Sequence, residues 1–147
     1  MTTHAYFEDY VPLAQKNLGH MLDFAVNTCN LNITEFYNFF LSSNISVEFA
    51  NGNPKYVAGM SGCELVTLIC LEAAISLEQD PVMYLDKSPE FWAGWAIAYY
   101  QWYRSKSFLE IAKVISMEEV ICMYSTLHEA DIMKFVSIVD ERFIKAI

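Results

Sequence analysis

The sequence has few of the residues and motifs on which catalytic sites depend. It contains three histidines, no Gly-x-Ser-x-Gly turn, and no cysteine in a local pattern typical of a nucleophile. Its four cysteines form no Cys-x-x-Cys pair, and no metal motif stands out. We therefore expect a non-enzymatic protein without a cofactor or a metal. Cys63 and Cys70, which share one side of an expected helix, are typical of buried thiols in a reducing cytosol.

Positive charge is scarce as well. The chain has 9 Lys and Arg against 18 Asp and Glu, which gives a net charge of −9. Because a negative field repels phosphate groups, we expect no direct nucleic-acid binding. The same field favours a basic protein partner, although solubility alone also accounts for it.

Long apolar runs are missing too. The two longest, 65–77 and 91–100, fall short of the roughly 18 residues that a membrane helix needs. The first residues, Met-Thr-Thr-His-Ala-Tyr-Phe-Glu-Asp, are polar and acidic, unlike a secretory signal. We therefore expect a cytoplasmic protein with no membrane segment.

The most informative feature that is present is the stretch 91–103, which holds seven aromatic residues and all three tryptophans. At about 100° per residue, six of these aromatics fall within roughly a third of a helix circumference. These six are Phe91, Trp92, Trp95, Tyr99, Trp102 and Tyr103. Gly94, Ala98 and Gln101 lie on the opposite side. The pattern predicts a central helix whose aromatic face fills the core. Its small face admits another backbone, either within the chain or in a homodimer.

Helix-start signals are frequent along the chain. A Ser or Thr followed three residues later by Glu satisfies two free amide groups at a helix start. Four such boxes occur, with a weaker Asn32–Glu35 relative and a Ser88-Pro89 start. The boxes are Ser61–Glu64, Ser107–Glu110, Ser116–Glu119 and Thr126–Glu129.

Together with apolar spacing, these signals predict an all-α fold. The expected helices cover 11–29, 33–43, 62–78, 89–104, 108–114, 117–124 and 127–146, with a turn at 45–50 and a glycine-rich connection at 51–62. Phe36, Phe39 and Phe40 are expected to point inward. No alternating strand pattern appears. We expect one domain, 1–147, folded as an irregular bundle of about five to seven helices around the aromatic helix.

Several polar patterns suggest chemistry, but each has a simpler explanation. Glu72 interrupts an apolar helix, and we expect it to face solvent or to pair with Arg104 or Gln101. The glycines of 59–62 precede a helix and could bind phosphate, yet Glu64 would occupy that helix start. A structural turn is therefore the preferred interpretation.

Two further patterns are weak. His128 with Asp131, and His20 with Asp23, have the i, i+3 spacing of metal ligands, but neither pair has a second histidine nearby. The two short helices of 108–121 have the layout of a helix-turn-helix. Their second helix carries Glu118 and Glu119, where a DNA reader needs Arg, Lys, Asn or Gln.

Two segments carry a family resemblance. They are Ser-Pro-Glu-Phe-Trp-Ala-Gly-Trp-Ala-Ile-Ala-Tyr-Tyr-Gln-Trp-Tyr at 88–103, and Gly-Asn-Pro-Lys-Tyr-Val-Ala-Gly-Met-Ser-Gly-Cys-Glu-Leu at 52–65. With them, the chain resembles a family of small, uncharacterised helical proteins of anaerobic gut bacteria, whose genes sit beside a gene for a toxin-like protein resembling ADP-ribosyltransferases. The resemblance implies an antitoxin-like or accessory role. It carries over no functional residue.

Our leading hypothesis is an acidic interaction protein that neutralises a basic partner, with exposed aromatic side chains as anchors. The expected partner-binding residues are Glu78, Asp80, Asp86, Glu118, Glu119, Tyr100 and Tyr103. An N-terminal arm with Tyr6, Phe7 and Tyr10 could dock on the chain itself or on a partner. Two alternatives stay open: a phage-type inhibitor that mimics nucleic acid, and a domain that binds a small molecule in its aromatic core.

Overall fold

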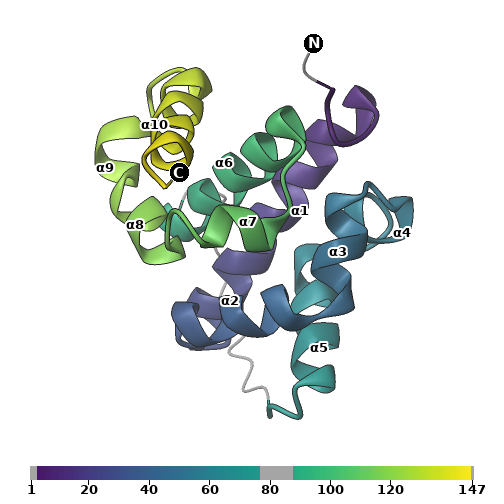
Figure 1. Cartoon of the computed structure of the whole chain (residues 1–147). Coiled ribbons are helices and arrows are strands. Elements are labelled where there is room, and N and C mark those ends of the chain that lie inside the picture. The colour runs from purple at the N-terminus through teal and green to yellow at the C-terminus, as the bar shows by residue number, and fades with distance from the viewer. Residues whose placement is uncertain (1–2, 77–87, 147) are drawn as a thin grey trace.

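The computed structural model describes residues 3–76 and 88–146, and within these ranges the chain is all-α without a strand (Figure 1). It has ten α-helices there, more than the five to seven expected. They are α1 (Val11–Asp23), α2 (Ile33–Ser42), α3 (Asn44–Ala50), α4 (Pro54–Val57), α5 (Gly62–Glu72), α6 (Pro89–Arg104), α7 (Phe108–Ala112), α8 (Met117–Cys122), α9 (Tyr124–Leu127) and α10 (Ile132–Lys145). A 3₁₀ turn, η1 (Glu8–Tyr10), precedes α1, and a π-helical stretch, η2 (Phe24–Thr28), continues it.

Serine side chains start three of these helices as predicted. Ser61, Ser107 and Ser116 each accept a hydrogen bond from the backbone N–H of the glutamate three residues later, and each glutamate side chain bonds back. Ser88 likewise caps α6, accepting from the Phe91 N–H at 3.0 Å, with proline in the first turn. Each bond joins residues only three positions apart, so the local sequence determines where these helices begin.

The fourth predicted box, Thr126–Glu129, is wrong. The last helix begins after Asp131, whose carboxylate accepts from the Met133 N–H at 2.9 Å. The Thr126 hydroxyl donates instead to the Met123 carbonyl, so residues 124–127 form the separate short helix α9.

Two further short helices occupy segments that were expected to be irregular. The turn expected at 45–50 is helix α3, and the connection at 51–62 contains α4. Asn53 caps α4 by accepting from the Lys55 N–H at 3.1 Å, and Pro54 follows as its first residue. Both are standard start signals, which the surrounding glycines obscured.

The centre of the fold is the close crossing of α1 and α6. A Cβ atom placed on Gly94 would lie 2.5 Å from the Leu18 carbonyl oxygen and 2.8 Å from the Gly19 Cα. A Cβ on Gly19 would lie 2.8 Å from the Phe91 carbonyl oxygen. The small face of α6 is therefore used inside the chain, and it offers no surface to a second copy.

The aromatic face of α6 does not fill the core as expected. Phe91, Trp95, Tyr99 and Tyr103 are only half-buried, whereas the alanines and the glycine of the helix are buried. Two aromatics of the face, Trp92 and Trp102, are buried. Trp95, Tyr99 and Tyr103 pack against the edge of the core and stay partly exposed, so the aromatic face fills the core only in part.

The expectation for the thiols is also partly wrong. Cys70 is buried, but Cys63 is exposed. Helical spacing places both on one side of α5, whose buried residues run from Gly62 to Cys70, so spacing alone does not decide the burial of a thiol. The pKa of Cys29 is raised by burial and then by Cys70 and Cys63. The remaining thiol, Cys122, is exposed.

Candidate functional site

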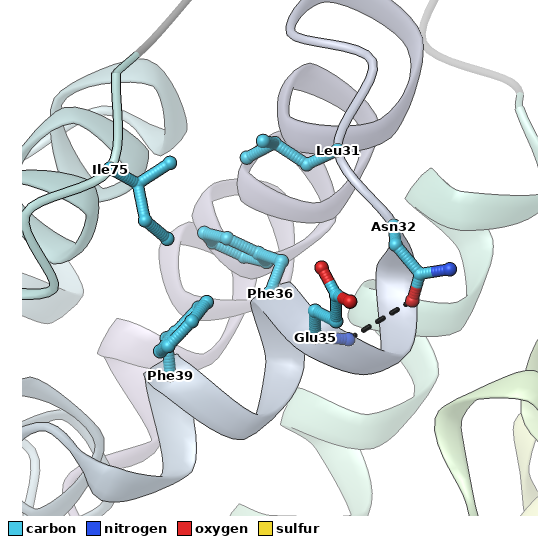
Figure 2. A pocket seen from close by; sticks show the side chains of 6 residues that line it. All are labelled: Leu31, Asn32, Glu35, Phe36, Phe39 and Ile75. Atoms are coloured by element: carbon cyan, nitrogen blue, oxygen red, sulfur yellow. Dashed lines mark hydrogen bonds between the residues drawn. The ribbon is translucent and has the colours of Figure 1, made fainter.

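A small pocket lies beside α2, next to acidic side chains. Its volume is about 180 Å³. We call it the α2 pocket; it is lined by Leu31, Asn32, Glu35, Phe36, Phe39 and Ile75. Figure 2 shows the four apolar side chains around a common space, with Glu35 and Asn32 on one side of it. The pocket thus combines an apolar wall with a polar edge.

Local structure places these side chains. Asn32 caps α2 by accepting a hydrogen bond from the Glu35 N–H at 3.1 Å (Figure 2). This bond determines where α2 begins. Phe36 and Phe39, three residues apart, are then neighbours on α2. Phe36 is buried, but Phe39 is 38% exposed, so the expectation that it points inward is wrong. Ile75, which follows α5, completes the pocket from another part of the chain.

Negative charge lies next to this pocket. Glu35 and Glu118 are both exposed, and the Thr34 hydroxyl donates to the Glu118 carboxylate, which brings α8 against the start of α2. Within residues 3–76 and 88–146, no ion pair engages either glutamate. Among the described residues, two carboxylates without a cation therefore lie at the start of α2.

Glu119, the neighbouring predicted site residue, has a different role. Arg142 of α10 donates to its carboxylate at 2.7 Å, and the Ser116 cap adds a second set of bonds. The hydrogen bond from Arg142 lowers the pKa of Glu119, followed by the bond from the Ser116 backbone. Glu119 thus ties α8 to α10, and its charge is already paired.

Tyr100 is not the surface anchor that we expected. It is 1% exposed, and its hydroxyl donates to Asp140 at 2.7 Å. It lies away from the aromatic face of α6 and stacks on Phe143, with ring centroids 6.1 Å apart. Burial raises its pKa, and the bond to Asp140 raises it further. Tyr100 therefore holds α10 against α6.

Tyr103 is half-buried at the far end of α6. His4 stacks on it with centroids 5.2 Å apart, and the Arg104 guanidinium lies 5.0 Å above its ring. The N-terminal arm docks on the chain itself here: the Ala5 N–H donates to the Trp102 carbonyl, and the Trp102 indole donates to the Tyr6 carbonyl. Tyr103 therefore contacts the N-terminal arm, whereas Glu118 contacts the start of α2.

The other predicted residues divide into two groups. Glu78, Asp80 and Asp86 lie outside the described residues. Glu72 is exposed, as expected, but its suggested partners are wrong. Arg104 pairs with Asp140, and buried Gln101 donates to two backbone carbonyls.

The weak metal pairs have structural roles. His128 stacks on Tyr124, and Asp131 caps α10. Asp23 is buried and accepts hydrogen bonds from Asn27 and from the Ser88 cap of α6. In the part of the chain that the structure describes, no three His, Cys, Asp or Glu side chains gather as metal ligands would.

The glycine-rich start of α5 is filled by protein. A Cβ atom on Gly62 would lie 2.4 Å from the Met21 backbone nitrogen, and the Glu64 side chain bonds back to the Ser61 N–H at 3.3 Å. A carboxylate at this helix start opposes an anion. The segment therefore acts as the structural turn that we expected.

Sequence reasoning missed the α2 pocket. The aromatic residues at 36, 39 and 40 span about 100° of a ten-residue helix, which is the ordinary width of a buried stripe, so they gave no signal of a pocket. The contribution of Ile75 had no sequence signal, because it depends on tertiary packing.

Comparison of the chain with protein-family models, with curated proteins and with solved structures finds no match. Over the described ranges, every helix is too short or too polar to cross a membrane.

Proposed function

We propose that this chain is a non-enzymatic interaction protein that binds a basic protein partner through the α2 pocket, Glu35 and Glu118. One observation carries the proposal: Glu35 lines an apolar pocket, Glu118 contacts the neighbouring Thr34, and neither carboxylate has a cation among the described residues. Apolar centres with charged rims are the usual anatomy of protein interfaces.

The size of the pocket favours a side chain over a small molecule. Sites for drug-sized ligands generally have about 300–1,000 Å³, whereas the α2 pocket has about 180 Å³. One apolar side chain of a partner suits this volume. The two carboxylates would then steer a basic segment toward it and set the salt dependence of association.

The proposed biological role is that of an antitoxin-like or inhibitory partner of a toxin or defence protein. The net charge of −9 supports binding to a basic protein, and the family resemblance of 52–65 and 88–103 supports the toxin context. Mimicry of nucleic acid toward a nucleic-acid enzyme would use the same charge. It differs in one measurable respect, since DNA or RNA would then compete for the partner.

A tagged pull-down from the native host, eluted with a salt gradient, tests the proposal. We expect a stoichiometric basic protein that elutes at lower salt from the Glu35→Gln/Glu118→Gln variant than from the wild type. The matched control, Glu129→Gln/Glu141→Gln, removes two other exposed charges and should leave elution unchanged. Absence of any stoichiometric partner at low salt contradicts the function. Equal elution from all three proteins contradicts the assignment to α2.

A further inference from the structure

A row of aromatic side chains runs along the surface side of α6. Trp95, Tyr99 and Tyr103 are four residues apart and all half-buried, and we call them the aromatic row. The rings of Tyr99 and Tyr103 are nearly parallel, at 14°, with centroids 5.6 Å apart. Residues four apart lie on one side of a helix, so the three rings lie along one strip of α6.

Acidic side chains border this strip. Glu8 of η1 and Asp131 at the start of α10 are exposed, and they come from opposite ends of the sequence. Burial raises the pKa of Tyr99 first, and the charges of Tyr103, Asp131 and Glu8 then raise it further. The contacts also place Asp131 near Tyr99, because the Tyr99 hydroxyl donates to the Met133 sulfur at 4.0 Å and the Met133 N–H donates to Asp131 at 2.9 Å.

One cation, the Arg104 guanidinium, already lies on a ring of the row. The Arg104 guanidinium lies 5.0 Å above the Tyr103 ring. Its charge is already matched by Asp140, which accepts two bonds from it, at 3.1 and 2.7 Å. In the part of the chain that the structure describes, no ion pair engages Glu8 or Asp131, so their negative charge can receive a further cation.

We propose that the aromatic row is a second contact surface, which stacks arginine side chains of a basic protein segment on Trp95 and Tyr99, because His4 and Arg104 already lie against the Tyr103 ring. A planar guanidinium stacks on aromatic faces and is weakly hydrated, whereas a lysine ammonium is compact and strongly hydrated. Phosphate-bearing partners are disfavoured by the two carboxylates. This surface goes beyond the proposed function and does not rest on it. Figure 1 shows the N-terminal arm and α2 at opposite ends of α1.

The probe is the peptide acetyl-Arg-Gly-Arg-Gly-Arg-amide, with its lysine counterpart for comparison. Binding to the full chain is followed through the aromatic proton–carbon NMR signals of Trp95 and Tyr99. We expect these signals to shift and the arginine peptide to bind about threefold or more tightly than the lysine peptide. The Tyr99→Leu variant should weaken arginine binding by about fivefold.

Three controls separate this surface from general acidity. Tyr56→Leu changes a half-buried tyrosine elsewhere and should leave binding unchanged. Glu8→Gln/Asp131→Asn removes the two charges while asparagine keeps the capability to cap α10, and it should weaken arginine binding and flatten its salt dependence. Unchanged melting temperatures by circular dichroism establish that each variant is folded.

Several results would overturn the proposal. Equal affinity for the arginine and lysine peptides would reduce the row to a generic acidic surface. Unchanged binding by Tyr99→Leu would remove the row from the site. Signal shifts that depend on protein concentration without peptide would mean that the row packs on a second copy. The Glu35→Gln/Glu118→Gln variant should not change the NMR response of Trp95 and Tyr99 to the peptide. A failure of the aromatic-row proposal therefore does not contradict the proposal for the α2 pocket.

Discussion

Replacing Gly94 with alanine should destabilise the protein, although alanine is the better helix former. The added Cβ would lie 2.5 Å from the Leu18 carbonyl oxygen and 2.8 Å from the Gly19 Cα. Both atoms belong to the α1 backbone, so no flexible side chain can move aside, and the two helices must separate. Overpacking of this kind costs about 3 kcal/mol, while the gain in helix propensity is about 1 kcal/mol. We therefore expect a net loss of about 2 kcal/mol.

Urea denaturation followed by circular dichroism measures this loss. The midpoint should fall without a change in slope, because the surface exposed on unfolding stays the same. The melting temperature should drop by about 4–8 °C. Ser137→Ala, on the exposed side of α10, is the control and should stay within about 0.5 kcal/mol of the wild type.

A second variant sharpens the test. Gly19 lies at the same crossing, so once Gly94→Ala has separated the helices, adding Gly19→Ala should cost less than it does alone. Neutral or increased stability of Gly94→Ala would refute the close crossing of α1 and α6. Strict additivity of the two substitutions would refute their sharing of one contact.

Three further predictions concern the links between elements. Tyr100→Phe removes a buried hydroxyl that donates to Asp140 and should cost about 1–2 kcal/mol in urea denaturation; a neutral result would contradict the bond. Arg142 of α10 lowers the pKa of Glu119, so this contact stabilises the folded chain fully at pH values above the ordinary glutamate pKa. The stabilisation is lost as the pH falls through the lowered pKa of Glu119. Glu119→Gln should flatten this acid dependence of the free energy of unfolding. Deletion of residues 3–6 should expose Trp102 and shift tryptophan fluorescence to longer wavelength; an unchanged spectrum would mean that the arm does not cover this indole.

Local signals predicted much of the helical fold. The bounds of α6 agree with the sequence prediction, 89–104, because Ser88 caps one end and the chain turns at Ser105, whose φ is +53°. The caps of α5, α7 and α8 were correct for the same reason. A cap joins residues three apart and needs no knowledge of the tertiary structure.

Burial depended on contacts that the sequence does not show. The aromatic face of α6 was expected in the core, but only Trp92 and Trp102 of that face are buried, whereas the Gly94 side is buried because Gly19 of α1 lets the two backbones approach. Tyr100 was expected at the surface, but α10 places Asp140 over its hydroxyl. Each outcome depends on a partner that is distant in sequence.

The candidate site shows the same division. Glu118 was predicted from charge alone, and it lies against Thr34 at the start of α2. The pocket beside it was not predicted, because Ile75 reaches Phe39 only through folding. Charge can be read from the sequence, whereas concave shape comes from packing between segments.

The most direct test of the proposed function is the affinity of the captured partner for two variants at low and high salt. Isothermal calorimetry would compare the wild type with Phe39→Ala and with Glu35→Gln/Glu118→Gln. We predict that Phe39→Ala weakens binding at both salt concentrations, because it removes an apolar contact. The glutamine variant should weaken binding mainly at low salt, because it removes exposed charge. Unchanged affinity for both variants would contradict binding through the α2 pocket.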